Sequence, residues 1–359
     1  MPTLAEGADT DTYFEQSGAV DIWDDLTDET KDLYRNIGID SLSDLSAKTL
    51  SYNALWSLTA DTLVEQSRTP LLVSGISLAA VVLCAYLGGM RDTVTGNGIQ
   101  SVYNGVSVLA VSSALLLPFT ACIRSVQYAL SGATVFMGSF SPVYMALLTV
   151  NGGLKTAASY QTTLLLFSQL LTALANGVLL PIMLTALALG VVSAASDTAN
   201  FSKMGEMLLR GVSWTLGIVA GVFTTLLSVN TTLGSAVDTL GNKMLKVSLT
   251  GLVPVVGGAL SEALLTVRSC IGVVKNTVGA FGIITVALLI LPPLLQCVCW
   301  FTCFWVSKTA AEVFDIAPLA KLLQTTLTVT KTMIAILLTT ALFMVIATTL
   351  VMLAGRGGG

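Results

Sequence analysis

Long apolar stretches alternate with short polar and charged ones from residue 71 onward, and this pattern predicts a bundle of membrane helices. Residues 71–90 carry no charge, and a helix of this length spans a hydrocarbon core about 30 Å thick. Similar stretches predict further spans at residues 105–122, 127–150, 164–192, 211–229, 278–306 and 332–353. The segment 164–192 is longer than one span requires and contains Pro181, so a long tilted or kinked helix is expected there. The charged segments 197–210 and 308–331 are predicted to be amphipathic connectors. We therefore expect an all-α polytopic membrane protein with about six to eight transmembrane or re-entrant helices.

Residues 1–70 follow an amphipathic pattern and are predicted to form an acidic extracytoplasmic region. A short helix is expected at residues 24–37, where acids precede bases and Gly38 acts as a stop, and two more at residues 43–48 and 54–66. Their apolar faces are too short to form a core of their own. Three arrangements are open for them: on the membrane surface, docked on a partner, or loosely folded in water.

The least ordinary apolar stretch lies between Lys246 and Arg268. Small and rigid residues interrupt it, namely Gly251, Pro254, Gly257 and Gly258. Because proline removes a backbone donor and glycine loosens a helix, we expect a broken helix or a re-entrant hairpin here. Lipid cannot satisfy irregular backbone, so this stretch must be covered by other helices or line water. These residues are therefore candidates for lining a pore or for close helix packing.

Glu262 is the acid inside this stretch. A carboxylate at the centre of a bilayer costs roughly 2.5–3.5 kcal/mol, so we expect Glu262 to face protein or water. Two interpretations are open. The carboxylate lines a pore or couples an ion, or it lies near the interface, six residues before Arg268, held by hydrogen bonds at the end of a hairpin.

Charge is divided unevenly along the chain. Residues 1–70 hold 14 of the 21 acids and 4 of the 17 bases, a net charge of −10, so the remaining residues carry +6. The acidic region is expected to be aqueous, and its charge disfavours contact with nucleic acid or anionic lipid. Few cations precede the first span and Arg91 follows it, which predicts an extracytoplasmic N-terminus.

No catalytic, cofactor or metal site is predicted. The chain has no histidine, which excludes Ser-His and Cys-His nucleophiles. Its six cysteines lie in or beside apolar spans, where we expect packing residues rather than metal ligands or disulfides. The sequence also lacks a GxxxxGK(S/T) phosphate-binding loop, so any ATP-driven step requires another chain. We therefore do not expect an enzyme.

Two pairs of prolines at nearly equal offsets suggest an internal repeat. Pro142 and Pro254 are 112 residues apart, and Pro181 and Pro292 are 111 residues apart. Three crossings per repeat would make the halves inverted, as in many transporters, whereas two crossings and a hairpin would make them parallel. The predicted divisions are a membrane domain at residues 71–355, candidate repeats at 127–230 and 247–354, and a short tail at 356–359.

The sequence VPVVGGALSEA at residues 253–263, with LPPLL at 291–295 and the apolar C-terminal span, resembles the stage III sporulation protein AE family. The similarity covers residues 71–355 and is strongest from Asp197 onward. It implies a non-enzymatic multipass subunit of the channel or secretion complex that links mother cell and forespore during endospore formation. The implied location is the mother-cell membrane around the forespore. The implied partners are the lipid bilayer, other stage III sporulation A proteins including a separate ATPase, a forespore channel protein and further copies of the chain, but not nucleic acid.

The start of the chain departs from this family, whose members usually begin with a signal peptide. Residues 1–10 are polar and acidic, so we expect that a signal has been removed or that the start is misassigned. A function of another class is also open, namely a stand-alone secondary transporter or permease-like subunit with a midplane site in broken helices. Transporters usually carry several intramembrane charges, whereas Glu262 is nearly alone, which counts against this alternative.

Overall fold

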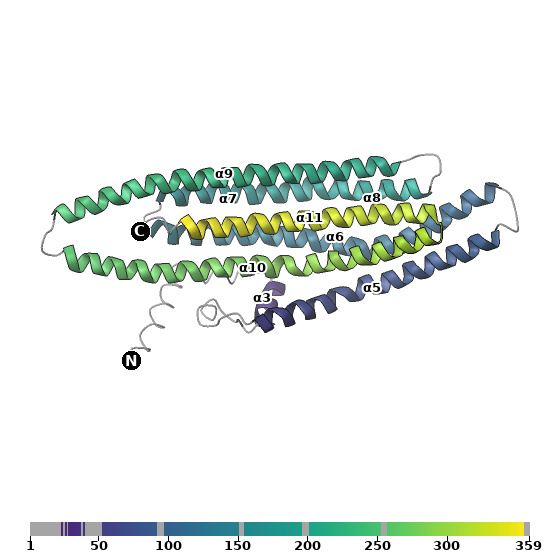
Figure 1. The fold of residues 1–359 in the computed structure, drawn as a ribbon, viewed down its shortest axis with the longest axis horizontal. Coiled ribbons are helices and arrows are strands. Elements are labelled where there is room, and N and C mark those ends of the chain that lie inside the picture. The colour runs from purple at the N-terminus through teal and green to yellow at the C-terminus, as the bar shows by residue number, and fades with distance from the viewer. Residues whose placement is uncertain are drawn as a thin grey trace.

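In the computed structural model, the chain forms one elongated bundle of long helices (Figure 1). The structure describes residues 28–36, 52–91, 97–150, 154–195, 201–252 and 257–354, with Trp23, Leu26 and Ile39; it leaves out some of their side chains, including those of 231–252 and 257–278. The described elements are α3 (Asp28–Asn36), α5 (Tyr52–Arg91), α6 (Asn97–Val150), α7 (Leu154–Leu174), the π-helical turn η1 (Ala175–Leu179), α8 (Leu180–Ala195), α9 (Phe201–Leu252), α10 (Gly257–Val313) and α11 (Ala317–Ala354).

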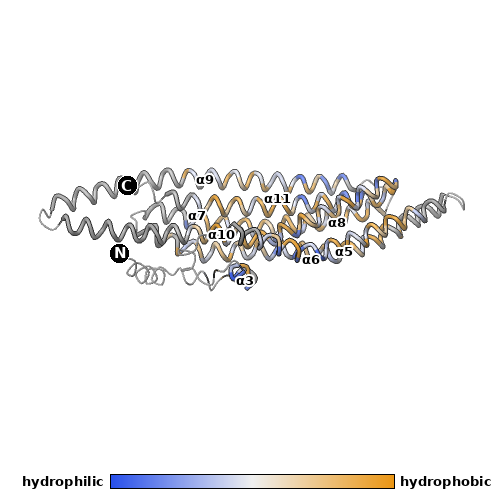
Figure 2. The backbone as a smooth tube through the Cα atoms, turned by 60° about the horizontal axis from the view of Figure 1, so that its bottom comes forward, coloured by the Kyte–Doolittle hydropathy of each residue, from blue (hydrophilic) through white to orange (hydrophobic). Residues whose placement is uncertain are grey.

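Five described helical segments are long and apolar enough to cross a membrane, which confirms the predicted helical membrane protein. These segments are Thr59–Tyr86, Gln161–Ala195, Lys203–Leu226, Gly279–Val313 and Ala317–Thr349. Figure 2 shows apolar residues along the length of the bundle and a largely hydrophilic α3 at its side. The hydrophobic pattern therefore identifies the fold class correctly.

Three helices are much longer than a bilayer is thick. α6, α9 and α10 contain 54, 52 and 57 residues. At 1.5 Å per residue each is about 80 Å long, compared with a hydrocarbon core of about 30 Å. These helices must therefore extend well outside the hydrocarbon core.

The boundaries predicted between spans and connectors are wrong in several places. The spans expected at residues 105–122 and 127–150 are one helix, α6, and the connector expected at 197–210 is largely the first part of α9. The helix expected at 54–66 continues into the first span as α5. Arginine, lysine and glutamate are good helix formers, so a helix can continue through them. A charged residue therefore indicates where a helix leaves the apolar medium, but it does not indicate where the helix ends.

The segment 308–331, predicted as one amphipathic connector, contains the turn between α10 and α11. α10 ends at Val313 and α11 begins at Ala317. Asp315 in this turn has a φ of 54°. A short polar side chain tolerates this left-handed conformation better than most, which explains why the chain reverses here.

Pro181 interrupts the long apolar segment 164–192 as the sequence suggests. It is the second residue of α8, two positions after the end of η1, and the amide of Leu180 between them donates to the carbonyl of Ala175. A proline ring clashes with the carbonyl four residues earlier in a regular α-helix. The wider π-helical turn accommodates this ring, so the two halves of the segment remain one nearly continuous helix.

α11 lies at the centre of the bundle and packs against α10, α9, α8 and α6. Thr326, Thr330 and Thr340 on this helix are buried, and each hydroxyl donates to the carbonyl four residues earlier. Their hydrogen bonds are thus satisfied without any neighbour. Small polar residues of this kind let membrane helices approach closely, which suits a central helix.

Aromatic side chains join the helices around α11. The ring of Phe223 on α9 packs at a tilt against those of Phe343 on α11 and Phe167 on α7, with ring centroids 3.9 and 4.8 Å away. A second cluster joins Phe119 of α6 to Trp300 of α10, with centroids 5.7 Å apart in an edge-to-face arrangement. These contacts fix the relative heights of helices that are distant in sequence.

The N-terminal helix α3 docks on α10 of the same chain. Tyr34 is fully buried, and its ring stacks on that of Phe281 with centroids 5.5 Å apart. Its hydroxyl lies 2.6 Å from the Thr285 Oγ1 and donates to the Phe281 carbonyl at 3.3 Å. The predicted helix at 24–37 is therefore present over residues 28–36, and its partner is the bundle itself. The helix predicted at 43–48 lies outside the described residues.

Candidate functional site

The residues that the sequence singles out lie around the junction of α9 and α10. Gly251 is in the last turn of α9, and Gly257, Gly258 and Glu262 are in the first turns of α10. Pro254 lies outside the described residues, as do the side-chain contacts of the others. Helices thus end on either side of residues 253–256. A pore-lining or packing role for these five residues stays a prediction.

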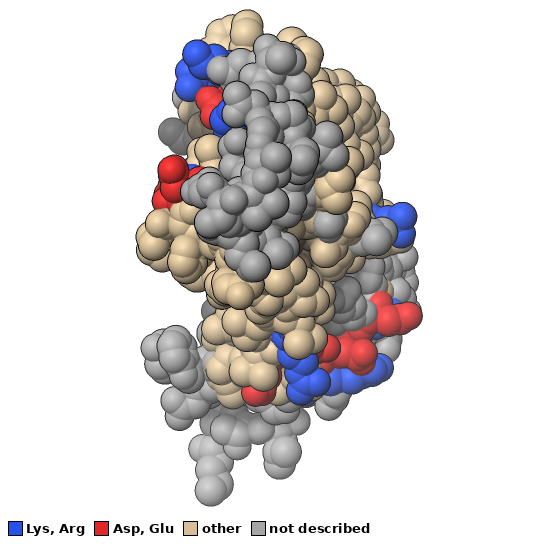
Figure 3. All heavy atoms as spheres, turned by 90° about the vertical axis from the view of Figure 1, so that its right-hand side faces the viewer, with Lys and Arg blue, Asp and Glu red and all other residues tan. Residues whose placement is uncertain are grey.

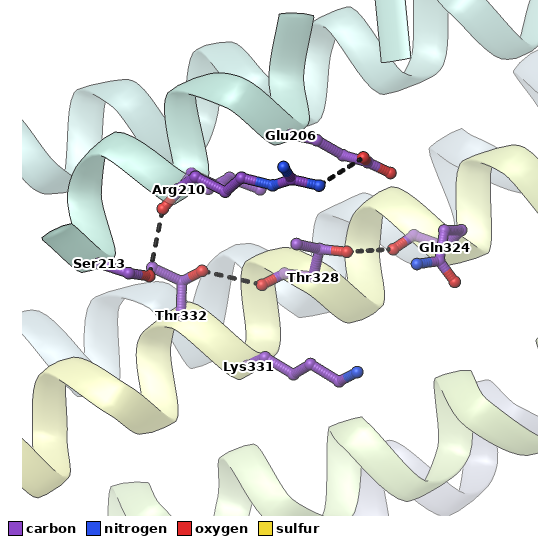
Figure 4. A pocket seen from close by; sticks show the side chains of 8 residues that line it. Glu206, Arg210, Ser213, Gln324, Thr328, Lys331 and Thr332 are labelled. Carbon is purple, nitrogen blue, oxygen red and sulfur yellow. Dashed lines mark hydrogen bonds and ion pairs between the residues drawn. The ribbon is translucent and has the colours of Figure 1, made fainter. Parts of the chain in front are cut away.

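A polar groove between α9 and α11 is the candidate site that the described side chains form (Figure 4). Its volume is about 400 Å³. It is lined from α9 by Glu206, Leu209, Arg210 and Ser213, and from α11 by Gln324, Thr328, Lys331 and Thr332. Within each set the residues are three or four positions apart or nearly so, which places each set on one face of its helix.

The charged side chains of the groove interact only weakly with one another. The Glu206 carboxylate lies 4.0 Å from the Arg210 guanidinium, and the Arg210 side chain is 85% exposed. An exposed pair at this distance contributes little to stability, so the guanidinium is available to a ligand. The Lys331 ammonium lies 5.6 Å from the centre of the Phe301 ring of α10. Figure 4 shows Arg210 on one side and Lys331 on the other side of the row formed by Gln324, Thr328 and Thr332, so the two cations flank the polar face of α11.

The hydroxyl groups of the groove use their protons within their own helices. Ser213 donates to the Leu209 carbonyl at 3.2 Å, and Thr328 donates to the Gln324 carbonyl at 2.9 Å. Thr332 donates to the Thr328 carbonyl at 3.0 Å. Their oxygens therefore offer acceptor lone pairs to the groove, while Arg210, Lys331 and the Gln324 amide offer donors.

This arrangement suits binding rather than covalent chemistry. The groove carries a formal charge of +1 from two cations and one carboxylate. Among the residues that the structure describes, no group of three His, Cys, Asp or Glu side chains could hold a metal ion. An anion with hydroxyl groups would find both charge and hydrogen-bond partners here.

Sequence reasoning missed this groove. It treated residues 197–210 and 308–331 as connectors, although Glu206 and Arg210 are four residues apart on one helical face. The i, i+4 spacing was the available signal. Nothing in the sequence indicates that this face meets the polar face of α11, more than 100 residues later.

The chain matches a family model described as stage III sporulation protein AE over residues 41–355. The stage III sporulation protein AE of Bacillus subtilis (strain 168) is 21% identical over 209 residues. That alignment covers 58% of the chain and 52% of the relative, so the chain matches about half the length of this curated protein. No solved structure matches the chain.

Proposed function

We propose, because the chain belongs to the stage III sporulation protein AE family, that it is a non-enzymatic multipass subunit of the channel or secretion complex joining mother cell and forespore. The family name implies a role in sporulation. The observation that carries the proposal is the extent of the match, because residues 41–355 include all five candidate membrane spans. The chain would form or scaffold the membrane-embedded part of the complex.

The length of the helices supports a role in assembly. Helices of about 80 Å project beyond a hydrocarbon core of about 30 Å, which leaves helical surfaces in water. We propose that these surfaces meet the other stage III sporulation A proteins and the forespore partner. The separate ATPase of this system would supply energy, since this sequence has no phosphate-binding loop. The mother-cell membrane, with the N-terminus outside the cytoplasm, is the proposed location.

Gly257 and Gly258 provide the test of this proposal. Leucine at either position should block assembly if the junction of α9 and α10 approaches another backbone closely. The measurement is co-purification of the tagged chain with other stage III sporulation A proteins from sporulating cells, together with the count of heat-resistant spores. Gly217→Leu is a matched control, because nothing lies within 4 Å of a Cβ at that exposed position. Normal co-purification and sporulation with both junction variants would contradict the proposal.

The groove favours a second candidate function, that of a secondary transporter. It adds Glu206, Arg210 and Lys331 to the charged side chains carried by the membrane helices. However, Arg210 and Lys331 stand at one end of charge-free stretches, whereas transporter sites lie near the midplane. Substrate-dependent uptake by proteoliposomes that contain this chain alone would support the transporter and overturn the subunit.

A further inference from the structure

We infer that the groove between α9 and α11 binds the headgroup of an anionic glycerophospholipid. This inference does not depend on the channel role. It rests on the level of the groove in the bundle, on its charge, on its hydrogen-bonding groups and on the apolar surface next to it.

The groove lies where two helices enter an apolar region. After Arg210, α9 has no charged residue for 27 positions, and the 23 residues of α11 after Lys331 carry no charge. Each stretch exceeds the roughly 20 residues that a bilayer requires. α9 and α11 run in the same direction (Figure 1), so both stretches begin at the same end. The groove is therefore at the level of lipid phosphates on one side of the membrane.

Further charges continue outward from the groove, as expected for a helix end in water. Lys203 precedes it on α9 and Lys321 precedes it on α11. The Lys308 ammonium near the end of α10 lies 3.0 Å from the Glu312 carboxylate. Figure 3 shows this end of the molecule, where basic and acidic side chains lie beside one another at several places on an otherwise uncharged surface.

The charge of the groove suits one phosphate diester. Arg210 and Lys331 outweigh Glu206 by one positive charge, and a phosphodiester carries one negative charge. A guanidinium donates two parallel hydrogen bonds to phosphate oxygens, and Arg210 is exposed enough to do so. Basic pockets between membrane helices are typical sites for acidic headgroups.

The hydroxyl groups favour a headgroup that itself carries hydroxyls. Ser213, Thr328 and Thr332 donate to their own helices and can accept from a ligand. Phosphatidylglycerol combines a phosphate with two hydroxyl donors, whereas a choline headgroup has no donor. We therefore expect selection for phosphatidylglycerol over phosphatidylcholine.

Apolar side chains continue the groove toward the membrane. Trp214 and Ile218 follow Arg210 by four and eight positions on α9, and both are exposed. Leu338 and Leu342 follow Lys331 by seven and eleven positions on α11 and are also exposed. These spacings keep each pair on the same helical face as its cation. Acyl chains can thus lie beside α9 and α11 while the headgroup occupies the groove. An acidic peptide that binds from water would not use this apolar surface.

The test compares lipid binding by the purified full chain and by a double variant, Arg210→Gln with Lys331→Gln. Native mass spectrometry counts dioleoyl phosphatidylglycerol, phosphatidylethanolamine or phosphatidylcholine retained by the protein in detergent. We expect retention of phosphatidylglycerol above the other two lipids, and a loss of at least about tenfold in the double variant. The matched control, Lys203→Gln with Lys321→Gln, removes the same charge from the same helices and should retain the lipid.

Two further measurements test whether the charges bind the lipid and whether the ligand is a lipid. Arg210→Lys with Lys331→Arg restores both charges and should recover most of the lipid binding, provided that circular dichroism shows equal helicity in all variants. Competition with glycerol phosphate separates a lipid from a soluble phosphate as the ligand. Equal retention of all three lipids, unchanged binding in the double variant, or full displacement by glycerol phosphate would each overturn the inference.

Discussion

Tyr34 is the residue that attaches α3 to the bundle. Its side chain has no exposed surface, and its hydroxyl lies between the Thr285 Oγ1 and the Phe281 carbonyl. Burial raises the pKa of Tyr34, and the hydrogen bond with Thr285 offsets only part of this shift. The neutral phenol is therefore favoured in the folded chain. Its contribution to stability is present below pH 10, the usual pKa of tyrosine, and is lost as the pH rises further.

Substitutions at Tyr34 should release α3 in proportion to the contacts removed. Tyr34→Phe keeps the ring stack and should cost about 1 kcal/mol, whereas Tyr34→Ala also loses the buried ring and should cost about 3–5 kcal/mol. Trypsin cleavage at Lys31 and Arg35 reports the release of α3. Tyr128→Ala, at an exposed tyrosine of α6, is the control and should leave cleavage unchanged. Equal protection in Tyr34→Ala and the parent chain would contradict the docking of α3.

Cys122 and Cys297 provide a covalent check on the packing of α6 against α10. Their sulfur atoms lie 3.6 Å apart, and both side chains are fully buried. We expect a membrane-permeant oxidant such as iodine to join them, which peptide mass mapping would detect as a pair of linked peptides. Cys122→Ser should abolish the cross-link. Cross-linking of Cys297 to another cysteine in the parent chain would show that these helices are packed differently.

At the scale of helices, contact distances decide where glycine is required. A Cβ added at Gly190 of α8 would lie 2.6 Å from the Thr325 Cγ2 of α11, and one at Gly282 of α10 would lie 2.7 Å from the Phe140 ring of α6. Real side chains do not approach so closely, so one partner would have to move. Glycine thus allows α8 to approach α11, and α10 to approach α6.

Alanine substitutions should change the stability of the bundle differently at these glycines and at exposed ones. Gly190→Ala and Gly282→Ala should each destabilise the bundle by about 1–3 kcal/mol through overpacking. Gly217→Ala adds a methyl group in open space and should be neutral or stabilising by up to about 1 kcal/mol, because alanine favours helix. Thermal unfolding of the purified chain in detergent measures the difference. Similar shifts for all three variants would contradict the close packing of α8 against α11 and of α10 against α6.

At the scale of the whole molecule, helix lengths determine which positions reach water. Met207 lies near the start of α9 and Val313 is the last residue of α10, and both are exposed. The start of α9 and the end of α10 lie at the same end of the bundle (Figure 1). Gly257 lies at the opposite end of α10. A helix of this length can reach water on both sides of a bilayer.

Single cysteines in a cysteine-free chain test this arrangement with a membrane-impermeant thiol reagent. Cysteines replacing Met207 and Val313 should react from the same side. Labelling of Val247 and Thr277 from one face, with Gly257 reachable from water, would establish the hairpin predicted from Pro254. Labelling of Met207 and Val313 from opposite sides would show that α9 and α10 are not arranged as described.

The sequence alone determines that this is a helical membrane protein of the stage III sporulation protein AE family. The length of the apolar stretches predicts helices that cross a bilayer. The order of acids and bases predicts α3, and Pro181 predicts where a long helix is interrupted. These features depend on residues close together in the chain, so local patterns predict them. The candidate repeats at 127–230 and 247–354 stay a prediction.

Only the tertiary structure decides which helices meet. The groove needs α9 and α11 side by side, and Tyr34 reaches a residue 247 positions away. In water, a hydrophobic pattern marks the buried face of a helix. In a membrane, lipid and protein interior are both apolar, so the pattern does not distinguish a face against lipid from a face against another helix. Shape, small residues and hydrogen bonds select the partners, and these become visible only when the helices are packed.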